Sequence, residues 1–136
     1  MIDVLATIRT LMLNEATIVA EVGQNIYAGE IPTGVTDSWD RPEDVTQILY
    51  LDAEVETRGE APVVEGTVYV ECLAASLDEA ARLAGVVVDA LDDHAKVEID
   101  GDHISYIDLI SGPTPSIDEE FGWCSCAVGF AVLIID

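Results

Sequence analysis

The sharpest alternation of polar and apolar positions opens the stretch 63–91. Its first ten residues place Glu65 and Glu71 on one side and valines on the other, which is the period of a half-buried strand. After Ser76 the apolar residues recur every three or four positions, the period of one helical face. Ser76 followed by Glu79 is typical of a helix N-terminus. The stretch therefore predicts a strand that leads directly into a helix.

The N-terminal residues predict a helix with a weak break near Asn14 and an end at Gly23, a natural C-cap. A short strand at 25–27 follows, and then a loop over 28–44 that holds several glycines, prolines and polar turn-formers. Residues 45–57 predict a second strand. The apolar stripe of the helix consists of Val4, Leu5, Ile8, Leu11, Met12, Ile18, Val19 and Val22.

A tight hairpin is predicted after the central helix. The pair Asp100-Gly101 lies between two short extended runs, 96–99 and 102–110. An Asp-Gly pair between such runs is a strong signal for a two-residue turn.

The C-terminal part contains a loop and a strongly apolar strand. Residues 111–120, SGPTPSIDEE, predict a Pro-rich acidic loop. The stretch 121–135 is apolar on both faces, which predicts a central strand or a strand with one face against a neighbouring subunit. The order of elements predicts an α+β fold: a two-layer sandwich in which a mainly antiparallel sheet is packed on one face by two helices.

The chain length predicts a single domain over 1–136. The longest nearly uninterrupted apolar run, 126–135, is half as long as the roughly 20 residues that a membrane helix needs, so we expect no membrane span. The N-terminal stretch has one base, Arg9, and no small-residue cleavage site, so we expect an amphipathic helix there and no signal peptide.

Charge is the strongest compositional signal, with 27 acidic residues against 5 basic ones and a formal net charge of -22. Such a surface repels nucleic acid, but half of the residues are hydrophobic, so the chain is expected to fold. Asp92 and Asp93 follow the central helix, where the helix dipole disfavours acids. We interpret the acidity as adaptation to molar salt, and the composition resembles that of proteins from salt-loving archaea and their viruses.

The three cysteines, Cys72, Cys124 and Cys126, are an odd number, and the last two are too close along one strand face for an unstrained disulfide. Buried free thiols are the favoured interpretation. A zinc site made by the three cysteines with His94 or His103 is the alternative, although the paired spacing of zinc knuckles is absent.

No motif for catalysis or cofactor binding stands out. Residues 100–103, Asp-Gly-Asp-His, lack the spacing of a calcium loop, and the sequence has no Gly-rich phosphate loop, serine elbow or HExxH. Acid pairs such as Glu119 and Glu120 arise from composition alone in so acidic a chain. We therefore expect no enzyme activity, no cofactor and no metal.

Two stretches resemble the tail-terminator (tail-completion) proteins of long-tailed phages and archaeal tailed viruses. The first stretch comprises Val22-Gly23, Ile26-Tyr27, Gly29 and Pro32, similar to the short VG-x-x-IY-x-G pattern of that family after an N-terminal helix. The second comprises Val68, Val70, Cys72, Ala74-Ala75, Glu79-Ala80, Leu83-Ala84, Val88 and Ala90-Leu91, similar to the family's strand followed by an EA-x-x-LA helix.

The resemblance implies a virion protein that is made in the host cytoplasm and forms a hexameric ring, a homo-oligomer of about six subunits, at the head-tail joint. Its partners would be the tail tube protein and the head connector or stopper protein. The genome would pass through the ring without specific binding, because an acidic lumen repels DNA. The alternatives are another neck, connector or minor tail protein, and a halophilic domain that binds a small ligand in a closed apolar pocket.

Eight residues form the candidate interface. Three lie in the loop after the first short strand, where Trp39 could instead fold back over its own core. The others lie in the Pro-rich segment and in the last strand. The set is Ile31, Val35, Trp39, Pro113, Pro115, Ile117, Trp123 and Leu133.

Overall fold

The computed structural model describes residues 3–36, 47–57, 63–92, 97–99, 101–117 and 123–135. The elements in chain order are α1 (Val4–Leu13), α2 (Ala16–Val22), β1 (Ile26–Ala28), α3 (Thr33–Thr36), β2 (Ile48–Thr57), β3 (Val63–Ala74), α4 (Leu77–Leu91), β4 (Val97–Ile99), β5 (Asp102–Ile117) and β6 (Cys124–Ile135).

The described strands form one mixed sheet in the order β1-β2-β3-β6-β5-β4. β1 pairs with β2 in parallel, and the other neighbours are antiparallel. β6 therefore lies between β3 and β5, as its apolar faces predicted. The α+β class is confirmed.

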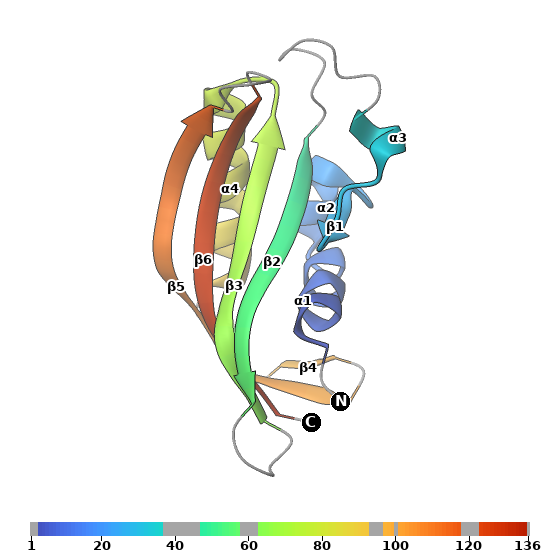
Figure 1. The fold of residues 1–136 in the computed structure, drawn as a ribbon, viewed down its shortest axis with the longest axis vertical. Coiled ribbons are helices and arrows are strands. Elements are labelled where there is room, and N and C mark those ends of the chain that lie inside the picture. The colour runs from blue at the N-terminus through green and yellow to red at the C-terminus, as the bar shows by residue number, and fades with distance from the viewer. Residues whose placement is uncertain are drawn as a thin grey trace.

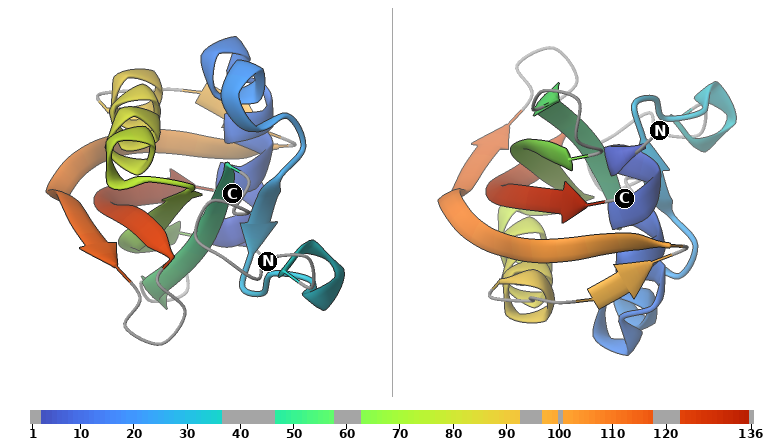
Figure 2. Two further views of the ribbon diagram at one scale, coloured as in Figure 1. Left: turned by 90° about the horizontal axis from the view of Figure 1, so that it is seen from above. Right: turned by 90° about the horizontal axis from the view of Figure 1, so that it is seen from below.

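The sheet is strongly curled, as Figure 1 and Figure 2 show. α1 contacts β1 and β2 near one edge of the sheet and β4 at the other edge. The Thr7 hydroxyl donates a hydrogen bond of 3.2 Å to the Asp102 carboxylate at the start of β5. One helix thus bridges the two ends of the curl, and the two-layer sandwich expected from the sequence stays a prediction.

The core fills the inner face of the sheet, beneath α1, α2 and α4. On β6, the alternate side chains Val128, Phe130, Val132 and Ile134 are buried in it. α4 contacts β3, β5 and β6, and its buried residues, Ala80, Leu83, Ala84, Val87 and Leu91, recur at the predicted helical spacing. In the part of the chain that the structure covers, no helix has the length and apolar character to cross a membrane.

The strand-to-helix unit agrees with the prediction from its periodicity. β3 ends at Ala74, and the Ser76 hydroxyl accepts a hydrogen bond of 3.2 Å from the Glu79 N–H. That bond satisfies one of the N–H groups that have no partner in the first turn of α4, and two acids lie in the same turn.

The N-terminal helix divides in two. Asn14 ends α1 and Glu15 begins α2, which ends at Gly23 with φ of 59°. Positive φ is the backbone conformation that favours glycine at a helix end. The weak break near Asn14 is therefore a complete interruption, which lets α2 leave the axis of α1.

The Asp-Gly hairpin is confirmed, because β4 and β5 pair antiparallel around Gly101, whose φ is 89°. The expected loop over 111–120 is wrong for its described part. β5 continues to Ile117 and stays in register with β6, with bulges near Ser111. Prolines are tolerated in such a strand when its other side pairs with no neighbour.

Asp92 has a local role that the sequence did not reveal. Its carboxylate accepts a hydrogen bond of 2.8 Å from the Leu109 N–H. The side chain therefore fixes the end of α4 to the side of β5 that faces away from β6. This contact gives a reason for an acid at a helix C-terminus without invoking salt; Asp93 lies outside the described residues.

Candidate assembly surfaces

A second, smaller apolar cluster lies on the outer face of the sheet, opposite the helices. Ile48 of β2 and Leu73 of β3 are register partners, and both are buried. Partly buried side chains from β1, β2, α3, the turn before α3 and the residue before β6 cover them. The covering residues are Tyr27, Ile31, Val35, Tyr50 and Trp123.

Hydrogen bonds fix the segment that covers this cluster. The Tyr50 hydroxyl donates to the Gly29 carbonyl at 3.0 Å, and the Gly29 N–H donates to the Leu51 carbonyl at 3.0 Å. The turn after β1 is therefore tied to β2 from both directions, and Gly29 itself has a positive φ of 79°.

The structure brings together three of the eight predicted interface residues, Ile31, Val35 and Trp123, in this second cluster. Each is half-buried against its own chain, so only part of each side chain is open to a partner. Trp39 lies outside the described residues.

The other predicted residues lie elsewhere. Pro113, Pro115 and Ile117 are exposed on the second half of β5. Leu133 is half-buried near the opposite end of the sheet, in register with Glu65 of β3 and Tyr106 of β5. The interface role of all these residues stays a prediction.

The second half of β5 is an exposed edge. β4 pairs only with its first residues, up to Ile104, and from residue 110 to 117 every side chain is exposed. Ile110 and Ile117 are 57% and 52% exposed, more than the other large apolar side chains of the described chain. Sequence reasoning missed Ile110, although the uncharged run around it was a usable signal.

Acids dominate the rest of the outer face. Glu54 of β2 and Glu65 of β3 line an open hollow of about 500 Å³ together with Thr67, Tyr106 and Ala131. The Tyr106 hydroxyl donates to the Glu65 carboxylate at 3.3 Å. The hollow is open and carries carboxylates, unlike the closed apolar pocket of a small-ligand site.

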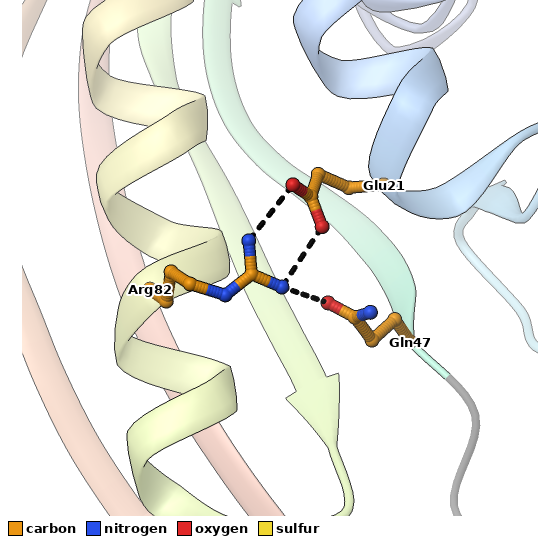
Figure 3. A network of polar contacts seen from close by, with 3 residues as sticks. All are labelled: Glu21, Gln47 and Arg82. Carbon is orange, nitrogen blue, oxygen red and sulfur yellow. Dashed lines mark hydrogen bonds and ion pairs between the residues drawn. The ribbon is translucent and has the colours of Figure 1, made fainter.

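The basic residues of the described chain, Arg9 and Arg82, hold elements together. Arg82 of α4 donates two hydrogen bonds to the Glu21 carboxylate of α2, at 2.8 and 2.9 Å, and one to the Gln47 side chain at 3.1 Å (Figure 3). The Arg9 side chain donates to the Ile26 carbonyl at 2.7 Å. The hydrogen bonds from Arg82 lower the pKa of Glu21 below its ordinary value.

All three cysteines are buried and none of them forms a disulfide, as predicted. Cys72 and Cys126 are register partners on β3 and β6. Burial raises the pKa of both thiols, so they remain protonated and are poor nucleophiles. Within the described ranges, no group of three or more His, Cys, Asp or Glu side chains could hold a metal ion.

With this geometry in view, the fold can be compared with solved structures. The fold matches a chain of the virion of a native gene transfer agent particle with a TM-score of 0.71. The match covers 98% of this chain and 95% of that chain at 14% identity, so it shows a shared fold. No protein-family model and no curated protein sequence matches this chain.

Proposed function

We propose that this chain is a structural virion protein whose copies form a ring at the head-tail joint, where the ring ends tail-tube assembly and joins the tail to the head connector. The observation that carries the proposal is the fold shared, over nearly the whole of both chains, with a chain of a gene transfer agent virion. A match of that extent involves the arrangement of all the elements and not one motif.

The two stretches that resemble tail-terminator proteins support the finer role. The first covers the end of α2, β1 and the turn at Gly29, which is tied to β2. The second covers β3 and the capped helix α4. Both stretches therefore correspond to ordered parts of the fold that hold the sheet edge and the core.

The charge distribution suits a ring around DNA. Carboxylates such as Glu54 and Glu65 lie on the outer face, and the described bases are used within the chain. A bore lined by acids would repel phosphates and let the genome pass without adhesion. A ring whose bore proved basic would reject this assignment.

The proposed role includes no catalysis. Cys72 and Cys126 are buried and protonated, and the acid-lined hollow is open. These features favour an assembly part over an enzyme or a small-ligand binder, since an active site normally combines a concave pocket with perturbed, accessible groups.

Native mass spectrometry and electron microscopy in molar salt test the ring directly. We expect closed rings of about six subunits. A protein that stays monomeric at high concentration would overturn the proposal.

Deleting the gene tests the position in the particle. Loss of a tail terminator should leave heads unjoined and tails of abnormal, often excessive, length in electron micrographs. Unjoined particles whose tails keep their normal length would instead indicate another neck or connector protein.

A further inference from the structure

Besides the mostly buried strand β6, two segments of this acidic chain are almost free of charge, and both carry exposed side chains. Residues 109–117 contain no charged side chain, and residues 24–36 contain only Glu30, although the chain has 27 acidic and 5 basic residues. Depletion of charge is the compositional mark of the buried centre of a protein interface.

The fold places these two segments at opposite sides of the sheet. The first is the exposed half of β5, beyond β6. The second contains β1, the other edge strand, and α3. Figure 1 shows α3 and the end of β5 at the same end of the molecule, on its two sides.

Both segments offer apolar contact area. Ile110 and Ile117 project from the β5 edge and are more than half exposed. On the other side, Ile31 and Val35 are half-buried around the second cluster, and Gly34 of α3 has open space around its Cα. Neither segment can bury this area within its own described chain.

We propose that the exposed half of β5 in one copy packs against the β1–α3 segment of the next copy. This inference rests on the proposed ring and names the contact that builds it. A second copy is the occupant that the charges favour. Two surfaces of the same chain, with its net charge of -22, can approach closely only where both lack acids.

The proposed contact is of the kind that builds a ring. The two segments differ, so the interface is heterologous, and each copy uses one segment on each side. A ring, and not an open filament, requires that this contact relate successive copies by a rotation with little rise. Pro113 and Pro115 lack N–H donors, so the contact is made by side chains and not by a continuous strand ladder.

Two charge insertions test the pairing. Ile117→Asp places a carboxylate on the exposed β5 edge, and Gly34→Asp places one on α3, where a Cβ meets nothing within 4 Å. In molar salt that supports wild-type rings, we expect each variant alone to be monomeric by native mass spectrometry. An equimolar mixture should form dimers, because the intact β5 edge of one variant can meet the intact α3 side of the other.

Val55→Asp is the matched control, since Val55 is an exposed apolar residue of β2 outside both segments. It should still form rings, and all three variants should keep the wild-type circular dichroism spectrum. The mixture is measured at high concentration, because a single contact lacks the avidity of a closed ring.

The outcomes separate the contact from the function. If Ile117→Asp and Gly34→Asp both still form rings like those of the wild type, the proposed contact is wrong, but the proposed ring is not contradicted. Loss of rings in Ile117→Asp but not in Gly34→Asp, or a mixture without dimers, would overturn the pairing of the two segments. Loss of rings in Val55→Asp would show that the contact between copies is not confined to the β5 edge and the β1–α3 segment. A monomeric wild-type protein would overturn the proposed function itself.

Discussion

On β6, Phe130 and Val132 point into the core and are fully buried, whereas Ala131 between them lies on the outer face in the hollow with Glu54 and Tyr106. Adjacent residues of one strand thus face two different environments. The inner face is stabilised by apolar burial, which is insensitive to charge screening. The outer face carries carboxylates, whose mutual repulsion depends on salt. The fold therefore depends mainly on the apolar inner face, and its response to salt depends on the charged outer face.

Removing salt should have the largest effect, because it acts on the charged surface of the whole chain and leaves the apolar core unchanged. The screening length is about 3 Å at 1 M salt and grows on dilution, so repulsion among the 27 acids rises. We expect the protein to unfold or dissociate below a few hundred millimolar salt, a loss of about 5 kcal/mol or more. Melting temperatures across a KCl series measure this. A neutral osmolyte at equal osmolality should not rescue it, and a melting temperature indifferent to salt would contradict it.

Phe130→Ala should have the next largest effect, now on the inner face. It removes a fully buried aromatic ring from the centre of the sheet, at an expected cost of about 3–5 kcal/mol in free energy of unfolding. The matched outer-face change is Tyr69→Ala, because Tyr69 on the neighbouring strand is 40% exposed. Urea titration at constant molar salt compares the two. Equal losses would show that the outer face contributes as much packing as the core.

Gly66→Ala and Gly85→Ala should change stability in opposite directions. A Cβ at Gly66 of β3 would overlap the Glu54 carbonyl oxygen and lie 2.7 Å from the Cα of Val55, so β2 must shift, at a cost of about 1–3 kcal/mol. Gly85 lies within α4 with open space around it, and Ala there should stabilise by about 0.5–1 kcal/mol. Thermal melts of both variants measure these changes in stability. A Gly66→Ala variant as stable as the wild type would contradict the close approach of the strands.

Glu21→Gln should have the smallest effect, at the exposed link between α2, α4 and β2. Because Arg82 lowers the folded pKa of Glu21, the ion pair stabilises the fold above the ordinary pKa of 4.5. That stability is lost as the pH falls through the lowered folded value. The difference in unfolding free energy between wild type and Glu21→Gln should therefore shrink as the pH falls below 4.5. Asp78→Asn is the control, because Asp78 also lies on a helix but makes no hydrogen bond to Arg82 among those that hold Glu21.

Local periodicity was enough to predict the elements whose structure is decided by residues close together in the sequence. The alternation of β3, the capped helix α4 and the Asp-Gly hairpin could each be predicted, because sequence neighbours decide them. The central position of β6 followed from its two apolar faces. β3, α4 and β6 contribute most to the core, where the burial of apolar side chains is the dominant requirement.

The features that sequence could not supply depend on distant partners. β5 runs through Pro113 and Pro115 because its other side is open there, which only the strand order shows. The second cluster joins Ile31 and Trp123, which are far apart in the chain. α1 also reaches β4 across the curl of the sheet, a contact with no local signature.

The central place of β6 also sets an order for biosynthesis. β6 follows the other described strands in the chain, yet it joins β3 to β5. A ribosome that has released the chain only through Ile117 holds two separate pieces of sheet, β1-β2-β3 and β5-β4, with unpaired backbone groups on the strands that face the gap. Closure of that gap therefore waits until β6 has left the exit tunnel, and nascent chains would be exposed to chaperones until then.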